Sequence, residues 1–317
     1  MKKGKKITIL GAGNVGATIA YTLTIEGYAN EIVLIDIKNE KAKGEAMDIR
    51  QGSPFTPEVN IYAGDYPDAA DSDIIIVTAG MGRKPGQTRI ELAQTNINII
   101  KEIIPQVVKY APDAIYIVVS NPVDIITYAI CKISGLPEKQ IIGSGTILDT
   151  ARLRTAVAAH VKMPSKMVTA YVLGEHGDTQ MVPWSLTSIG GMPMQEYCEN
   201  VCPKMSKCGK VELNDIVEDV RTAGAKVIAN KGATFYAIAL SVKRLCETIV
   251  RDSESIHTVS TMMHGEYGIS DICISLPYII DGNGIKRRFE AKLTDDEIVK
   301  LKKSADALKE VVKNLQF

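Results

Sequence analysis

The segment Gly174-Glu175-His176-Gly177-Asp178 holds the histidine with the clearest chemical possibilities in a chain of 317 residues that has only four histidines. A histidine carries protons near neutral pH, and it becomes a catalyst when one group orients it and another holds the substrate. Asp149 and Arg152 could supply these two roles. Being three residues apart, they would share one face of a helix. Taken alone, His176 is more simply a turn histidine, and Asp149 and Arg152 are an ordinary salt bridge within a helix.

A glycine-rich sequence, Gly11-Ala12-Gly13-Asn14-Val15-Gly16, follows the first expected strand and opens the first expected helix. In that context it predicts a dinucleotide site, because Gly11 permits a tight turn, Gly13 lets the backbone approach a pyrophosphate, and Gly16 lets the helix pack on the strand. The helix N-terminus attracts the phosphates. Asp36, at the end of the second strand, would bind ribose hydroxyls and so favours NAD over NADP, although Lys38 nearby leaves NADP open.

The elements that must position these residues change rhythm near residue 145. Before it, short β-rich runs alternate with helical patterns, which predicts a doubly wound parallel sheet. We expect strands at 7–10, 32–37, 60–63, 74–78, 115–120 and 140–143, and helices at 15–26, 89–109 and 123–134. After it we expect helices at 147–161, 214–230 and 233–250, strands at 167–173, 257–263, 272–280 and 285–291, and a last helix opened by a Thr294/Glu297 capping box. The fold prediction is therefore an α/β Rossmann domain, residues 1–146, followed by an α+β substrate domain, residues 147–317.

Composition excludes several other classes of protein. Lys plus Arg equals Asp plus Glu at 37 each, so no overall positive field attracts nucleic acid or a membrane surface. No window approaches the roughly 20 apolar residues of a membrane span, and no signal peptide opens the chain, so we expect a cytoplasmic protein. Among six cysteines, Cys198, Cys202 and Cys208 cluster without a C-x-x-C spacing or a nearby histidine. Reduced thiols are favoured over a zinc site, and no metal is predicted.

Over essentially its whole length the chain resembles the L-lactate dehydrogenase and malate dehydrogenase family. Besides the motifs above, the resemblance rests on Thr78-Ala79-Gly80, Ser120-Asn121-Pro122-Val123-Asp124 and Lys231-Gly232-Ala233-Thr234. It implies an NAD-dependent enzyme that interconverts a small 2-oxo acid and its L-2-hydroxy acid, and it suggests a homotetramer. It also implies that Thr78, Ala79, Gly80 and Asn121 contact the cofactor.

The resemblance also implies roles for the polar residues. Protonated His176 would hydrogen-bond the carbonyl oxygen and deliver a proton, while Asp149 orients and stabilises the imidazolium. Arg152 would bind the substrate carboxylate with its planar fork. Arg89, after a glycine-rich lid over residues 80–88, would polarise the carbonyl. Asn121 would contact substrate and cofactor, and Thr234 would line the pocket wall. Their simpler interpretations are a solvated first-turn charge for Arg89, an Asn-Pro turn for Asn121 and a helix-start threonine for Thr234.

Arg83 in the lid departs from the lactate pattern, which has a neutral glutamine there, and resembles malate dehydrogenases. With pyruvate the closed pocket would hold Arg83 without a partner, at a cost of several kcal/mol, whereas oxaloacetate would offer a second carboxylate. This favours oxaloacetate and L-malate slightly. Pyruvate and L-lactate remain the alternative, because Glu175, residues 143–146 and residues 231–234 resemble the lactate branch, and Arg83 could extend to solvent.

Further residues bear on regulation and on two competing functions. Bacterial lactate dehydrogenases activated by fructose 1,6-bisphosphate carry a basic pair at a subunit interface, where this chain has Arg154 but Thr169, so strong activation is not expected. NAD-dependent glycosidases need a metal-binding cysteine where this chain has Ser120. A non-catalytic NAD(H) sensor would not need Asp149, Arg152 and His176, and all three are present.

Overall fold

A computed structural model describes residues 5–82, 86–201 and 210–317. Within these residues one sheet has nine strands in the order β12-β11-β10-β6-β5-β4-β1-β2-β3, and a small sheet has the order β7-β8-β9. The strands are β1 Lys6–Leu10, β2 Glu31–Ile35, β3 Asn60–Ala63, β4 Ile74–Val77, β5 Ile115–Val118, β6 Ile141–Gly143, β7 Val168–Thr169, β8 Ser188–Ile189, β9 Met192–Pro193, β10 Ser255–His264, β11 Ser270–Asp281 and β12 Gly284–Arg288.

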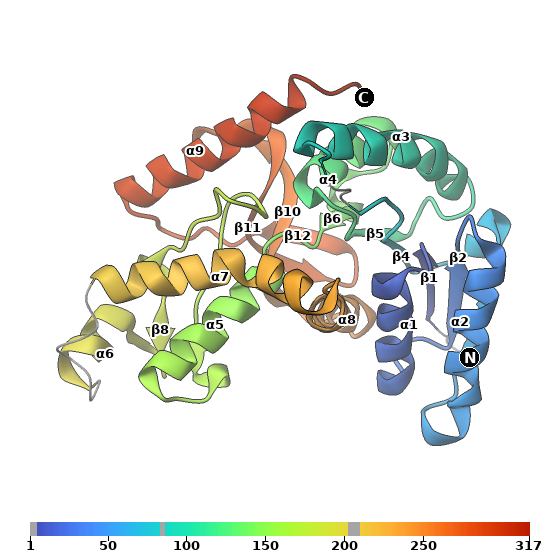
Figure 1. Ribbon diagram of the computed structural model, residues 1–317, viewed down its shortest axis with the longest axis horizontal. Helices are drawn as coiled ribbons and strands as arrows, with labels where there is room; N and C mark the ends of the chain where they lie inside the picture. The colour runs from blue at the N-terminus through green and yellow to red at the C-terminus, as the bar shows by residue number, and fades with distance from the viewer. Residues whose placement is uncertain (1–4, 83–85, 202–209) are drawn as a thin grey trace.

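The helices cover the large sheet and fill the space between the two sheets. They are α1 Asn14–Glu26, α2 Asn39–Gln51, α3 Arg89–Val108, α4 Val123–Ile133, α5 Ile147–Val161, α6 Met194–Asn200, α7 Lys210–Lys231, α8 Tyr236–Val250 and α9 Asp295–Val312. Figure 1 shows the first half of the chain, in blue to green, on the right, with α5, α6 and α7 on the left and α9 above them. None of the helices in the described part of the chain is both long and apolar enough to span a membrane.

The strands β1 to β6 form the parallel, doubly wound part that the sequence predicts. β4 and β5 are buried along their whole length, as expected of central strands with helices on both faces. β1 pairs with both β2 and β4 in parallel register, so the chain reverses its order across the sheet beside β1. In sheets of this type ligands bind at the carboxyl ends of the strands at such a switch point.

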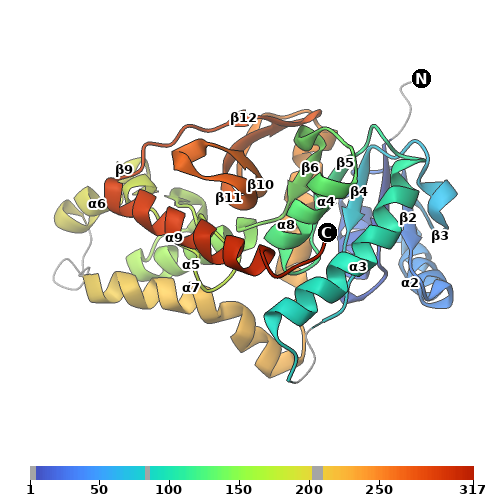
Figure 2. The same cartoon turned by 90° about the horizontal axis from the view of Figure 1, so that it is seen from above.

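The second half of the chain continues the same sheet. β10 pairs with β6 in antiparallel fashion through Ser260 and Gly143, and β11 and β12 follow as an antiparallel meander. Seen from above, β10, β11 and β12 lie between β9 on one side and β4 and β2 on the other (Figure 2). Within the large sheet the two halves therefore meet at one strand pair, while outside it α1 packs on α8 and α4 packs on β10 and β11.

One expectation about secondary structure was wrong, and one helix had not been named from the sequence. The run 167–173 pairs as a strand only at Val168–Thr169, and the segment after it makes isolated bridges, Leu173 to Met181 and Gly174 to Ser275. The helix α2 was not expected, because its buried residues are only Ala42 and Ala46 and it has no apolar stripe. The expected capping box of the last helix is present, with the Thr294 and Glu297 side chains each accepting the other's backbone N–H.

Candidate functional site

Asp149 binds both His176 and Arg152. Its Oδ2 lies 2.6 Å from His176 Nδ1, and its Oδ1 accepts from Arg152 Nη1 at 2.8 Å. Asp149 and Arg152 stand one turn apart near the start of α5, whereas His176 stands in the turn after Gly174. The side chains are 3 % exposed for Asp149, 18 % for Arg152 and 29 % for His176. The geometry gives the imidazole a buried carboxylate at Nδ1 and leaves Nε2 for a ligand.

The electrostatics of this group favour a protonated imidazole. Burial by itself would lower the pKa of His176, but the charge and hydrogen bond of Asp149, with a smaller contribution from Asp124, outweigh burial and raise that pKa. Burial would raise the pKa of Asp149, yet His176 and Arg152 hold it below its usual value. The arrangement can therefore hold a proton on His176 next to the Arg152 guanidinium, which Asp149 engages through Nη1 only.

A cavity of about 320 Å³ opens in front of His176. It brings together six predicted site residues, namely Val15, Asn121, Asp149, Arg152, His176 and Thr234. The wall also includes residues of α7, among them Arg221, Gly224 and Ile228, which no sequence motif predicted. Because Val15 comes from the glycine-rich loop and His176 from the second half of the chain, the cavity spans the meeting of the two halves.

The glycine-rich loop has the geometry that a bound dinucleotide needs. Gly11 has φ +102°, and a Cβ on Gly16 would lie 1.9 Å from the Gly11 carbonyl oxygen, so both positions require glycine. A Cβ on Gly13 would meet nothing within 4 Å, which leaves this side of the loop open. The helix α1 begins at Asn14 without a side-chain cap or an acidic residue in its first turn. Its amide groups are therefore available to phosphate oxygens.

Asp36 lies beside this loop, as predicted. Its Oδ2 accepts from the Ala12 amide at 2.7 Å and its Oδ1 from the Lys38 amide at 2.8 Å. These bonds fix the carboxylate at the carboxyl ends of β1 and β2, where it can accept hydrogen bonds from ribose hydroxyls. The donor set of this loop and Asp36 thus fits NAD.

Hydrogen bonds connect the segments that carry the predicted cofactor residues Thr78, Ala79, Gly80 and Asn121. Thr78 Oγ1 donates to the Gly11 carbonyl at 2.9 Å, and Ser120 Oγ donates to the Ala79 carbonyl at 2.6 Å. Gly80 has φ +156°, and a Cβ there would come within 3.2 Å of Asn96 Oδ1. The same Asn96 donates through Nδ2 to the Asn121 carbonyl at 2.6 Å. The three motifs thus form one hydrogen-bonded rim.

Arg89 lies outside the group around His176. Its Nη2 donates to Asp178 Oδ2 at 2.5 Å, with side-chain exposures of 55 % and 66 %. Asp178 lines the cavity, but Arg89 is not among the lining residues. The structure thus places Arg89 at the cavity entrance on a carboxylate partner. Arg83, with residues 84 and 85, lies outside the described residues, and so do Cys202 and Cys208.

Two acidic residues belong to the sequence motifs but had no role predicted from the sequence. Asp178 ends the histidine motif and binds Arg89, and Asp124 ends the Ser120–Asp124 motif and accepts the backbone amide of His176 at 2.7 Å. Their positions within motifs were the available signal. The α7 residues gave no such signal, because they are close to His176 only through packing.

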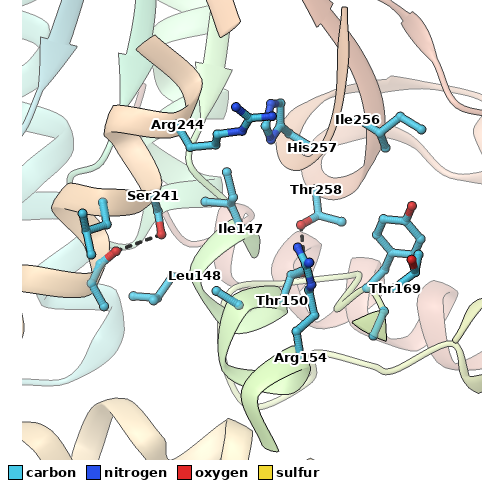
Figure 3. Close-up of a pocket in the computed structure, with 15 residues that line it drawn as sticks. Ile147, Leu148, Thr150, Arg154, Thr169, Ser241, Arg244, Ile256, His257 and Thr258 are labelled. Carbon is cyan, nitrogen blue, oxygen red and sulfur yellow. Dashed lines mark hydrogen bonds between the residues drawn. The ribbon is translucent and has the colours of Figure 1, made fainter. Parts of the chain in front are cut away.

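A second cavity, of about 490 Å³, lies between α5, α8 and β10 (Figure 3). Arg154, Thr169, Arg244 and His257 line it, and none of Asp149, Arg152 and His176 does. Arg154 Nε donates to the Val168 carbonyl at 2.8 Å. Burial lowers the pKa of His257 to about 4, and its Nε2 lies 3.0 Å from Thr248 Oγ1. Its histidine therefore does not titrate near neutral pH, and the smaller cavity is the candidate active site.

Family models and known proteins match this chain over nearly its full length. Residues 5–143 match the family model for the lactate/malate dehydrogenase NAD binding domain, and residues 146–316 match that for the lactate/malate dehydrogenase alpha/beta C-terminal domain. The chain is 50 % identical over 313 residues to an L-lactate dehydrogenase of Acetivibrio thermocellus, covering 99 % of this chain and 98 % of the relative. It is 48 % identical over 310 residues to L-lactate dehydrogenase 1 of Clostridium acetobutylicum, covering 98 % of each. The crystal structure of the minor L-lactate dehydrogenase of Enterococcus mundtii superposes with a TM-score of 0.94 at 37 % identity, covering 99 % of each chain.

Proposed function

The chain belongs to the lactate/malate dehydrogenase family and is an NAD-dependent dehydrogenase, and from that premise we propose that it interconverts pyruvate and L-lactate. The observation that carries the proposal is the similarity, 44–50 % identity over nearly the full length, to relatives that are named L-lactate dehydrogenases. A non-catalytic NAD(H) sensor is not supported, because the acid–base group is intact and faces the cavity.

In this proposal His176 moves the proton. Protonated His176 donates a hydrogen bond from Nδ1 to Asp149. From Nε2 it donates a proton to the carbonyl oxygen of the 2-oxo acid, and it takes that proton back in the reverse direction. The raised pKa of His176 keeps the proton available near neutral pH. When bound, NADH would supply the hydride for reduction and NAD⁺ would accept it in the reverse direction. Asp149 stays ionised throughout and stabilises the imidazolium.

Arg152 holds the substrate in place. Its Nη1 is engaged by Asp149, which fixes the plane of the guanidinium and leaves the other donors for the substrate carboxylate. Asn121 and Thr234 line the same cavity and would contact the carbonyl end and the methyl group of the substrate. Arg89 would exchange Asp178 for the substrate carbonyl. Water exclusion would then strengthen each of these contacts.

The cofactor lies, in this proposal, along the glycine-rich loop. Gly11, Gly13, Asn14, Val15 and Gly16 would approach the pyrophosphate. Asp36 would bind the adenosine ribose. The rim residues Thr78, Ala79, Gly80 and Asn121 would face the nicotinamide half. Residues 1–146 would thus bind NAD and residues 147–317 the acid. A cytoplasmic homotetramer, suggested by the family resemblance, belongs to the same proposal.

Oxaloacetate and L-malate remain a second candidate because of one residue. Arg83 offers a charge that pyruvate cannot neutralise, and a second carboxylate could. The relatives support pyruvate over this interpretation.

Steady-state NADH oxidation with pyruvate and with oxaloacetate, for the parent and for Arg83→Gln, separates the two. We expect pyruvate to have the higher kcat/KM in the parent. We expect Arg83→Gln to lower kcat/KM for oxaloacetate by about 10-fold or more while leaving that for pyruvate within a fewfold, since only the dicarboxylate has a group for Arg83. A parent that prefers oxaloacetate would overturn the pyruvate proposal. His176→Gln should bind NADH, seen by its fluorescence, without turnover of either acid.

A further inference from the structure

Beneath the histidine turn lies a second buried carboxylate, Asp124, in the first turn of α4. Its Oδ2 accepts a 2.7 Å hydrogen bond from the His176 backbone amide, and the residue is 2 % exposed. The helix N-terminus favours a negative charge at this position. Asp124 thus fixes the backbone of His176, while Asp149 fixes its ring.

The other oxygen of this carboxylate faces the strand that joins the two halves of the molecule. Asp124 Oδ1 and Ser260 Oγ are both buried, and over the described residues neither makes a hydrogen bond of ordinary length and angle, yet they lie close enough for the Ser260 hydroxyl to lower the pKa of Asp124. Ser260 belongs to β10 and pairs with Gly143 of β6. Burial raises the pKa of Asp124 to about 6, while the Ser260 hydroxyl and the His176 amide and charge act to lower it. Asp124 is therefore largely ionised at pH 7 and above.

The charges around the histidine explain what an ionised Asp124 does. His176 faces the charges of Asp149, Arg152 and Asp124, and Asp124 itself faces His176 and Glu175. Arg152 and Asp149 neutralise each other as a salt bridge. A protonated His176 would then leave an excess positive charge in a largely buried group, which is costly. Ionised Asp124 makes the charges of Asp149, Arg152, Asp124 and protonated His176 sum to zero, and the partly exposed Glu175 lies outside this sum.

We propose that Asp124 is a positioning residue for His176, whose buried carboxylate anchors the histidine backbone and supplies a second negative charge that stabilises the protonated imidazole. The proposal rests on the role of His176 in the proposed function. It assigns the two carboxylates different tasks, since Asp149 sets the ring tautomer and Asp124 contributes charge without touching the ring.

The test is Asp124→Asn, because the amide oxygen can still accept the His176 backbone hydrogen bond while the charge is lost. NMR titration of the histidine rings reads the pKa of His176 directly, and with four histidines in the chain the His176→Gln spectrum assigns its signal. We expect the pKa of His176 to fall by roughly half a unit to one unit. The pH profile of kcat/KM for 2-oxo acid reduction should move to lower pH by the same amount, with little change at acidic pH.

A purely structural role would lower activity equally at all pH values and leave the pKa of His176 in place, and that result would overturn the proposal. The matched control is Asp271→Asn. Asp271 pairs with Lys132, which lies on the same helix α4 about 12 Å along the axis from Asp124. The Asp271→Asn substitution should therefore leave the pKa of His176 unchanged.

Where Asp124→Asn does not fold, Ser260→Ala decides. Removing the hydroxyl raises the pKa of Asp124, so the pKa of His176 should fall by a smaller amount than with Asp124→Asn. A folded Ser260→Ala with an unchanged His176 titration would then refute the proposal. The NMR readout does not depend on turnover. An Asp124-dependent pKa in a protein that reduces neither acid would refute the proposed function alone, and turnover with an Asp124-independent pKa would refute this inference alone.

Discussion

The inner and outer sides of the cavity are built in different ways. On the inner side, Asp149 is buried and holds both His176 and Arg152 at hydrogen-bond distance. On the outer side, Arg89 and Asp178 form a single pair in which both side chains are more than half exposed. The inner side is held together by hydrogen bonds among its own side chains. The outer side must exchange one partner for another before Arg89 can reach a substrate.

This difference separates the residues proposed for proton transfer from those proposed to select the 2-oxo acid. In the proposed function, proton transfer uses groups that the fold holds together, so the fold sets the reaction class. The choice of acid depends there on Arg89 and, as the sequence predicts, on Arg83. Substitutions on the inner side should therefore cost far more than those on the outer side, and three variants test this ranking.

Asp149→Asn should have the largest effect. We expect kcat/KM for 2-oxo acid reduction to fall by about 10²–10⁴-fold at pH 7, because the imidazole loses its orienting partner and its counter-charge. Asp149 raises the pKa of His176, so its removal lowers that pKa, and the deficit should grow as the pH rises. A pH series of initial rates from about 5.5 to 9 measures it, with NADH fluorescence as the binding control. A deficit that is the same at every pH would mean that Asp149 orients the ring without affecting its charge.

Arg152→Lys should come next. A lysine can keep the charge and a contact to Asp149, but it loses the planar fork that binds a carboxylate through two hydrogen bonds. We expect KM for the 2-oxo acid to rise by about 10²-fold, with a smaller change in kcat and no shift of the pH profile. Steady-state kinetics over a wide substrate range gives both constants. An unchanged KM would place the substrate carboxylate elsewhere and would break the comparison on its inner side.

Asp178→Asn should have the smallest effect. An exposed ion pair contributes at most about 1 kcal/mol, so freeing Arg89 should lower KM by no more than about fivefold. The difference between parent and variant should shrink as salt is added, because salt screens the pair that is being removed. Measuring KM at low and high ionic strength tests this. A loss of activity comparable to that of Asp149→Asn would show that the entrance is as finely built as the interior.

The fold was largely predictable because strand and helix periods are local. The parallel strands β1 to β6 lie within a few residues of their expected positions, since, apart from the edge strand β3, their apolar residues are buried on both faces. The run 167–173 misled because Val168, Ala170 and Val172 are buried against helices without pairing as a continuous strand. The exposed helix α2 carried no apolar stripe to reveal it.

The site was predictable only where its residues share a motif or a helical turn. Asp149 and Arg152 are one turn apart, so their contact follows from spacing. Their contact with His176 was inferred from chemistry and the family resemblance, and the structure brings the three together. The Asp124 bond to His176, the Arg89 pair with Asp178 and the α7 wall depend on how distant segments pack. No local pattern encodes those contacts.

The pairing of β10 with β6 has a consequence for how the protein is made. β6 is complete at Gly143, but its partner residue Ser260 is synthesised more than a hundred residues later. At elongation rates of about 5–20 residues per second, the nascent parallel sheet keeps an open edge for roughly 10 s. Such an edge can pair with other chains. The β6 edge is therefore covered only after β10 has been synthesised. From then on, the C-terminal half protects the nucleotide-binding half from edge-to-edge aggregation.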